Sequence, residues 1–264
     1  VELYAINIFE FGNEKKDINK LWVRGGFPES LLSATERDSY MWRLDFIKTY
    51  LERDIPQLGP RIPAETLGRF WTMLAHNQGT VLNASQLAKS LGISGMTIGR
   101  YLDLMVDLLL VRRLRPWTSN EGKRLVRSPK VYVRDSGITH ALLNISNYND
   151  LLGHPVVGGS WEGFIIENIL SIAPPEMRPY FYRTSNKAGS EIDLILEFTA
   201  KERWAIEIKR STSPSVSKGF HIACEDIKPT RKYVLYSGSA NFSMGNDTRA
   251  ISLNDLMEEI IKRK

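Results

Sequence analysis

Two short acidic segments near the C-terminal end constrain the fold of this chain more than any other feature. Residues 191–196 read Glu-Ile-Asp-Leu-Ile-Leu, and residues 205–209 read Ala-Ile-Glu-Ile-Lys. Charges set among Ile and Leu in this way predict two β-strands. Side chains two positions apart on a strand share a face, so Glu207 and Lys209 point the same way. If the two strands pair, Asp193 can meet both of them.

Such a meeting point has the outline of a hydrolytic site. Two neighbouring carboxylates attract a hard, oxygen-seeking cation such as Mg²⁺. We therefore expect Asp193 and Glu207 to be metal ligands, with Lys209 holding a phosphate or orienting a water in a metal-dependent phosphodiesterase. The same pattern also fits a half-exposed antiparallel strand pair with cross-strand ion pairs, and both interpretations stay open.

Length, charge and cysteine content limit the remaining choices. The 264 residues suffice for two domains, and the net charge of +5 permits a polyanionic partner. A single cysteine, Cys224, excludes an intramolecular disulfide and a cysteine-rich zinc site. With neither a run of about 18 apolar residues nor a signal peptide, we expect a cytoplasmic protein without a membrane partner. A start at Val1 instead of Met predicts a fragment of a longer protein.

The first third of the chain predicts helices after an irregular start. We expect an apolar strand over residues 1–10, a charged linker over 11–20, and a turn at Gly25-Gly26 that leads into a helix. Apolar residues at helical spacing predict a long helix from Glu36 to Ile55 and another over 64–77. No Gly-x-x-x-x-Gly-Lys-Ser/Thr pattern occurs, so the double glycine is not a phosphate loop.

The segment from residue 83 to 134 has the pattern of a winged helix. A short helix over 84–91, a glycine turn and a second helix over 97–105 predict a helix-turn-helix. A strand over 111–117 and a returning strand that ends at 130–134 would form the wing. Basic residues dominate the wing and could neutralise backbone phosphates. We expect nucleic-acid contacts from Arg112, Arg113, Lys123, Arg124 and Arg127 of the wing and from Arg100 of the second helix.

The second helix argues against the reading of base edges. Arg100 is accompanied there by Asp103 and Asp107, and the Arg, Asn and Gln set that recognises bases is missing. DNA is therefore the expected partner through its phosphates. A winged helix can also be a protein-docking or purely structural module, and this alternative stays open.

The expected domains follow from these segments. Residues 1–36 form an arm, 37–145 a winged helix-turn-helix domain, 146–159 a linker rich in turn formers, and 160–264 a second domain. The second domain begins with a helix that carries Glu162 and Glu167. These two are five residues apart, so at most one of them can reach the Asp193 site. The order helix, three strands, helix, strand, helix predicts a sheet covered by helices.

This order of elements, with a glutamate on the first helix, Asp193 on a strand and Glu207-x-Lys209 on the next strand, resembles the PD-(D/E)XK nuclease superfamily. The resemblance implies that Asp193, Glu207, Lys209 and Glu162, less so Glu167, are the catalytic residues, with Mg²⁺ as cofactor. The expected fold class is mixed α+β, with an N-terminal helical winged-helix domain followed by an α/β restriction-endonuclease-like domain.

A wider resemblance covers nearly the whole chain. It is carried by short phrases that begin at Trp22 (Trp-Val-Arg-Gly-Gly-Phe-Pro-Glu), Thr49 (Thr-Tyr-Leu-Glu-Arg-Asp-Ile), Arg124 (Arg-Leu-Val-Arg-Ser-Pro-Lys-Val-Tyr), Tyr182 (Tyr-Arg), Glu191 (Glu-Ile-Asp-Leu) and Ile206 (Ile-Glu-Ile-Lys). Together they resemble the C-terminal region that follows an AAA+-type ATPase module in many bacterial and archaeal proteins. The resemblance implies an N-terminal P-loop ATPase in the same polypeptide, which would bind ATP outside this chain, and it permits an oligomer.

Three functions are compatible with these observations. The chain is the DNA-binding and DNA-cleaving end of an ATPase, or a catalytically silent nuclease-like module that binds nucleic acid or protein, or a region that regulates or oligomerises the ATPase. Retention of Asp193, Glu207 and Lys209 together favours the first function over the second. The weakly basic second helix favours the third function over base-specific reading of DNA.

Overall fold

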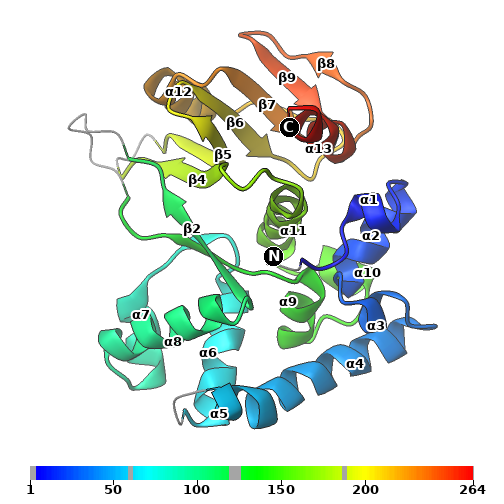
Figure 1. The fold of residues 1–264 in the computed structure, drawn as a ribbon, viewed down its shortest axis with the longest axis vertical. Helices are drawn as coiled ribbons and strands as arrows, with labels where there is room; N and C mark the ends of the chain where they lie inside the picture. The colour runs from blue at the N-terminus through cyan, green and yellow to red at the C-terminus, as the bar shows by residue number, and fades with distance from the viewer. Residues whose placement is uncertain (1–3, 59–61, 119–125, 186–188, 264) are drawn as a thin grey trace. The chain divides into compact units, whose positions relative to one another are not determined.

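The chain forms two compact units. The computed structural model describes residues 4–58, 62–118, 126–185 and 189–263 (Figure 1). Unit 1 comprises residues 1–113 and 131–167, and unit 2 comprises residues 114–130 and 168–264. The helix α11 (Val157–Ser171) and the strand β2 (Val111–Pro116) each contribute residues to both units. The predicted linker 146–159 contains the helix α10 (Tyr148–Leu152) and the start of α11.

Unit 1 is largely helical. Its helices are α1 (Ile8–Phe11), α2 (Lys15–Arg24), α3 (Pro28–Leu31), α4 (Glu36–Thr49), α5 (Ile55–Leu58), α6 (Ala64–His76), α7 (Ala84–Leu91), α8 (Gly95–Asp107), α9 (Ser136–Leu142) and α10, together with the first part of α11. The helices α2, α4 and α6 all pack against the central helix α9.

The start of unit 1 differs from the predicted strand and linker. Asn7 caps α1, because its side chain accepts from the Phe9 N–H while Glu10 accepts from the Asn7 N–H. This capping box explains why a short helix replaces the expected strand over residues 1–10. The predicted charged linker over 11–20 is also wrong, because α2 begins at Lys15 and buries Trp22 and its neighbours in its last turn.

The predicted long helix from Glu36 to Ile55 is interrupted. After α4 ends at Thr49, the chain makes a turn of π-helix, η1 (Tyr50–Asp54), and continues as α5. Pro56 is the second residue of α5 and directly follows the π-helical turn. The helical segment therefore continues past Pro56 to Leu58, beyond the predicted end at Ile55.

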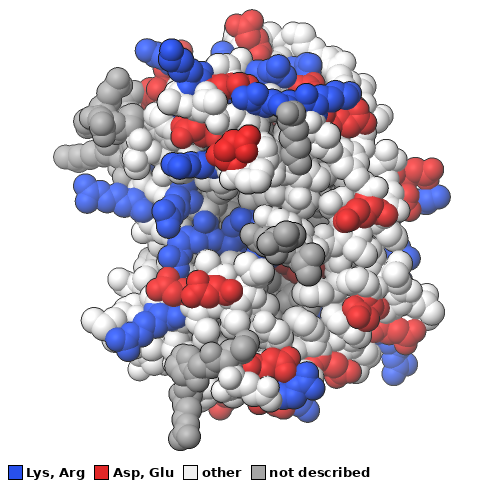
Figure 2. All heavy atoms as spheres, in the orientation of Figure 1, with Lys and Arg blue, Asp and Glu red and all other residues white. Residues whose placement is uncertain are grey.

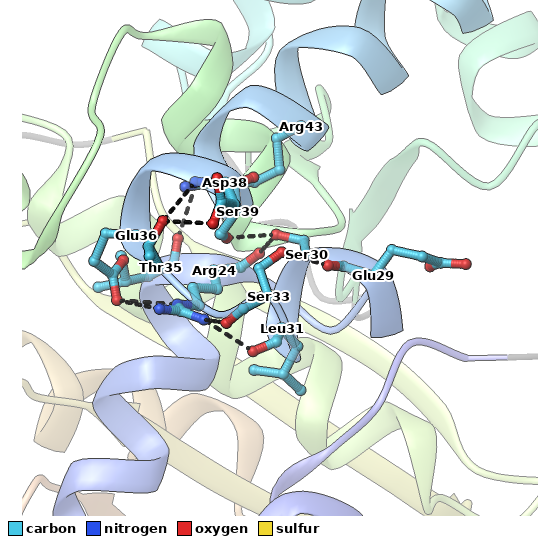
Figure 3. A network of polar contacts seen from close by, with 11 residues as sticks. Arg24, Glu29, Ser30, Leu31, Ser33, Thr35, Glu36, Asp38, Ser39 and Arg43 are labelled. Atoms are coloured by element: carbon cyan, nitrogen blue, oxygen red, sulfur yellow. Dashed lines mark hydrogen bonds and ion pairs between the residues drawn. The ribbon is translucent and has the colours of Figure 1, made fainter.

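The turn at Gly25-Gly26 leads into α3, as predicted. Gly25 has φ of +77°, and a Cβ there would lie 2.1 Å from the Asp135 carboxylate, so glycine is required. Figure 3 shows how the neighbouring Arg24 fastens this turn to α4. Its guanidinium donates to the carbonyls of Leu31 and Ser33 and pairs with Glu36.

The two helices predicted over 84–91 and 97–105 form as α7 and α8, and α8 begins two residues earlier and ends two residues later than predicted. Asn83 and Ser94 cap α7 and α8, and Gly92 adopts the left-handed conformation between the two helices. Three strand segments of unit 1 pair in the order β1-β3-β2. They are the short strand β1 (Thr80–Val81), the unit 1 part of β3 (Lys130–Val133) and the unit 1 part of β2. The Gln78 side chain reinforces this edge, because it donates to the Val133 carbonyl and accepts from the Val133 N–H.

Unit 2 is a mixed sheet with helices packed on it. Its elements are β4 (Arg178–Arg183), β5 (Glu191–Thr199), β6 (Glu202–Ile208), α12 (Lys218–Ile227), β7 (Arg231–Leu235), β8 (Phe242–Ser243), β9 (Thr248–Ile251) and α13 (Leu253–Lys262). The strand order is β2-β4-β5-β6-β7-β9-β8. The pairs β4–β5 and β5–β6 are antiparallel, whereas β6–β7 and β7–β9 are parallel. The order of elements matches the prediction, with β8 and β9 added before the last helix.

The core of unit 2 lies between α12 and the sheet. Phe220, Cys224 and Ile227 of α12 pack against Ile195 and Ala205 of β5 and β6. This packing makes Cys224 a buried core residue, and burial raises the pKa of its thiol to about 12. Among the described residues, no helix combines the length and apolarity that crossing a bilayer requires.

Candidate functional site

The pairing of β5 with β6 brings the two acidic segments together. Leu194 lies opposite Ile206, and Ile195 lies opposite Ala205. The next opposed positions along this antiparallel ladder are those of Asp193 and Glu207, which share the face covered by α12. The charge of Asp193 is close enough to Glu207 to raise its pKa.

Asp193 is held by a backbone amide and a lysine. Its Oδ2 accepts a hydrogen bond of 2.9 Å from the Ile208 N–H. Its Oδ1 lies 3.7 Å from the Lys130 ammonium, which also forms an ion pair of 2.9 Å with Glu191. Lys130 is only 2% exposed, so these carboxylates compensate a charge that is almost completely buried.

Glu207 is buried beside a second lysine. Its Oε1 lies 2.6 Å from the Lys209 ammonium, and the Ser217 hydroxyl donates to its Oε2 at 3.3 Å. Burial raises the pKa of Glu207, and Asp193 adds to the increase, although Lys209 and Ser217 act in the opposite direction. Ser217 also caps α12, so the helix start is fixed at this carboxylate.

We call this group the carboxylate cluster and define it as Lys130, Glu191, Asp193, Glu207, Lys209 and Ser217. Three carboxylates face two ammonium groups, and Glu191 also pairs with the Arg183 guanidinium at 3.8 Å. Within the described ranges, no three acidic, histidine or cysteine side chains are arranged to hold a metal ion. The donors that oppose each other, Asp193 and Glu207, fit a cation that keeps most of its water ligands, as Mg²⁺ does.

Three members of the cluster, Lys130, Glu191 and Ser217, were not among the predicted site residues. Glu191 shares the face of Asp193 by strand parity, and Ser217 precedes a helix, yet neither position identifies a site by itself. The signal for Lys130 is stronger, because it is a single charge at the head of the buried strand Lys-Val-Tyr-Val. A lysine in such a strand needs a carboxylate partner, which the two acidic segments supply.

The helix glutamates lie in unit 1 and have partners there. Glu162 accepts a hydrogen bond of 2.6 Å from the Tyr132 hydroxyl. Glu167 pairs with Arg112 and, at 3.0 Å, with Arg134. A role for Glu162 in the site stays a prediction, whereas Glu167 is committed to its two arginines.

The predicted phosphate contacts divide into three groups. Arg112 pairs with Glu167 and Arg113 with Asp103, so salt bridges within unit 1 engage both guanidinium groups. Arg100 and Arg127 are exposed. Lys123 and Arg124 lie outside the described residues. Figure 2 shows basic and acidic side chains interspersed over the face that it draws.

Comparison with known proteins identifies the family of the chain. Residues 15–149 match the family described as Domain of unknown function (DUF8612), so the chain belongs to it. Residues 157–256 match a second family, described as Domain of unknown function (DUF4143). The chain is 40% identical over 257 residues to "Uncharacterized protein Rv2008c" of Mycobacterium tuberculosis and to "Uncharacterized protein Mb2031c" of Mycobacterium bovis. The alignment covers 97% of this chain but 57% of each relative. No solved structure matches the chain.

Proposed function

We propose that this chain is the DNA-binding and metal-dependent DNA-cleaving region of an AAA+-type ATPase. The observation that carries the proposal is the placement of Asp193 and Glu207 at opposed positions of β5 and β6, with the Lys209 ammonium 2.6 Å from Glu207. The relatives are longer than this chain, which leaves room in them for the ATPase module that the sequence resemblance implies. The ATPase, its ATP and any oligomer are parts of this proposal.

The nuclease part rests on the chemistry of unit 2. A bound Mg²⁺ would activate a water and offset charge on the phosphate. Asp193 and Glu207 would hold the ion from adjacent strands, and the bond from the Ile208 N–H would keep the Asp193 carboxylate oriented. Lys209 would hold the scissile phosphate or the attacking water, because its ammonium already lies at the edge of the cluster and its side chain is 35% exposed.

The DNA-binding part rests on unit 1 and the segment that follows it. The helices α6, α7 and α8 and the strand order β1-β3-β2 support the proposal of a winged helix. Arg100 on α8 and Arg127 before β3 are the exposed candidates for phosphate contacts among the described residues. Arg112 and Arg113 leave this group because salt bridges engage them.

A catalytically silent module is the second candidate, and Lys130 favours it. An ammonium group beside Asp193 compensates the carboxylate that a metal ion would otherwise neutralise. In that case unit 2 would bind nucleic acid or protein, or regulate the ATPase, on a nuclease-like scaffold. Cleavage assays separate the two candidates.

The test of cleavage uses the intact protein with ATP, Mg²⁺ or Mn²⁺, and branched or single-stranded DNA. We expect cleavage that requires the metal and disappears in Asp193→Asn and Lys209→Met. Glu197→Gln is the matched control, because Glu197 lies on β5 but pairs with Arg203, away from the cluster. DNA binding without metal-dependent cleavage would replace the nuclease proposal with the silent module.

The test of DNA binding uses the same DNA at increasing salt. Each phosphate contact contributes a slope of about −0.9 to log K against log salt on duplex DNA. Arg127→Ala and Arg100→Ala should each weaken binding to unrelated sequences alike and reduce this slope. Lys262→Ala on α13 removes one exposed charge elsewhere and should leave the slope unchanged. Affinity that ignores salt would instead support a protein-docking wing.

A further inference from the structure

Lys130 lies where a cation would approach Asp193. Its ammonium is 3.7 Å from Asp193 Oδ1, the oxygen of that carboxylate that the Ile208 N–H does not occupy. Glu191 binds the same ammonium at 2.9 Å. The Phe181 ring centroid lies 5.6 Å from it and adds an attractive aromatic face.

Each of the four carboxylate oxygens of the two candidate metal ligands has a protein partner within 3.7 Å. On Asp193 the partners are Lys130 and the Ile208 N–H, and on Glu207 they are Lys209 and Ser217. A divalent cation that binds both carboxylates therefore competes with Lys130 for Asp193 and with Lys209 for Glu207, because the ion and the ammonium groups carry the same sign of charge.

The two lysines differ in how easily they can withdraw. The Lys209 side chain is 35% exposed and follows the end of β6, so its ammonium can turn into water. The Lys130 side chain is 3% exposed, so its charge cannot turn into water and needs another carboxylate. Glu191 is that carboxylate, because it already binds Lys130 more closely than Asp193 does.

We infer that Lys130 is a built-in competitor of the metal ion, released from Asp193 onto Glu191 when a divalent cation binds. This inference rests on the proposed function, since it concerns the same metal site. It makes Lys130 a regulator of metal occupancy and Glu191 the group that accepts its charge. Removing the Lys130 charge should strengthen metal binding, and removing the Glu191 charge should weaken it.

The experiment measures Mn²⁺ binding to the 264-residue chain by isothermal titration calorimetry, without DNA. The variants are Lys130→Met and Glu191→Gln, with Asp193→Asn to identify the site. Arg203→Met is the matched control, because Arg203 pairs with Glu197 on the same two strands but away from the cluster. Circular dichroism melts establish folding, and Lys130→Gln replaces Lys130→Met if the latter does not fold.

We expect Lys130→Met to bind Mn²⁺ about ten-fold more tightly than the wild type, because a positive charge close to the ion is removed. Glu191→Gln should bind more weakly, and Arg203→Met should match the wild type. If Lys130→Met bound Mn²⁺ with the affinity of the wild type, and Asp193→Asn abolished Mn²⁺ binding, the inference would be overturned but the proposed metal site would stand. Absence of binding in both the wild type and Lys130→Met would overturn the inference and the proposed metal site together.

Discussion

The two units each bury a polar centre, and the two centres are built differently. In unit 1, His140, Ser160 and Trp22 form a chain of hydrogen bonds between neutral groups. The Trp22 indole N–H donates to Ser160 Oγ at 3.0 Å, and Ser160 lies 2.7 Å from His140 Nε2. His140 Nδ1 lies 2.9 Å from the Val23 carbonyl, which can only accept, so Nδ1 carries the proton. Every polar atom of this chain is then satisfied.

The carboxylate cluster of unit 2 is unlike this neutral chain. It contains formal charges, and it reaches solvent through Lys209 and Glu191. A serine beside a histidine suggests a nucleophile, yet Ser160 and His140 are both completely buried and their bonds are complete. The comparison teaches that formal charge and access to solvent, rather than residue types, distinguish the carboxylate cluster from the neutral chain of unit 1.

The largest predicted effect concerns Arg43, which belongs to the unit 1 network. Arg43 is fully buried and donates to the carbonyls of Val23, Gly137 and Ser39. Its replacement by Met removes three hydrogen bonds from a fully buried position, and among the described residues only the Val23 carbonyl of the three keeps a side-chain donor, His140. We expect a loss of about 4 kcal/mol in the free energy of unfolding, measured by urea denaturation. Arg37→Met, on the exposed face of the same helix, should change it by less than about 0.5 kcal/mol. A similar small loss for Arg43→Met would show that the buried arginine is dispensable.

The next largest effect concerns Glu167 of unit 1, which is paired with two arginines. Burial raises the pKa of Glu167, but its ion pairs with Arg112 and Arg134 outweigh burial and hold it below the usual value. Glu167→Gln should therefore cost about 3 kcal/mol at neutral pH, because it leaves two arginines without their carboxylate. The wild type should exceed Glu167→Gln in free energy of unfolding above the pKa of Glu167 in the unfolded chain. This difference should vanish as the pH falls through the pKa of Glu167 in the folded chain. Urea denaturation of both proteins at a series of pH values measures it, and a constant difference would contradict the pairing.

Local signals in the sequence predicted the common face of the acidic strands in unit 2, but they did not predict the buried hydrogen bonds of His140 in unit 1. The parity of Asp193, Glu207 and Lys209 depends only on strand alternation, so their common face could be inferred without a structure. The helix caps at Asn83 and Ser94 are equally local. In contrast, the hydrogen bonds of His140 connect residues 20 and 117 positions apart, which no local pattern encodes.

The same limit applies to the partners at the site, whereas the error at the chain start has a local cause. Lys130 joins the cluster through strand pairing that sequence spacing does not specify. The ion pair of Arg112 with Glu167 could not be predicted either, because the two residues lie 55 positions apart. The α1 capping box was local, and Asn7 with Glu10 could have predicted it. Overlooking this pair led to the prediction of a strand.

A smaller effect tests the protonation state of the unit 1 network. Burial lowers the pKa of His140 to about 3, since the charged ring would lose water and oppose the nearby Arg43. The unfolded chain binds this proton near pH 6.5 while the folded one does not, so stability falls as the pH decreases from there. Between pH 7 and pH 5 the loss from this group should be about 2 kcal/mol. Urea denaturation at both values measures the loss. His140→Gln removes the titrating group and should lower this pH dependence by that amount, whereas an unchanged dependence would mean that His140 is protonated in the fold.

The smallest effect has the opposite sign and lies in the cluster. Burial raises the pKa of Glu207, with a further increase from Asp193, so the ionised form is disfavoured in the folded chain. A carboxyl group whose folded pKa is raised contributes stability at low pH that is lost as the pH rises through that pKa. At pH 7 the ionised Glu207 therefore destabilises the fold, and Glu207→Gln should stabilise it by up to about 1 kcal/mol. Urea denaturation at pH 7 and pH 4 should show this gain shrinking at the lower pH.

Glu197→Gln, which breaks the pair with Arg203 on the same strands, should not stabilise the chain. If Glu207→Gln destabilised the protein as Glu167→Gln does, the cluster would be a structural ion-pair network like that of unit 1. A gain in stability together with a loss of Mn²⁺ binding would mark Glu207 as a residue retained for a site at the expense of stability.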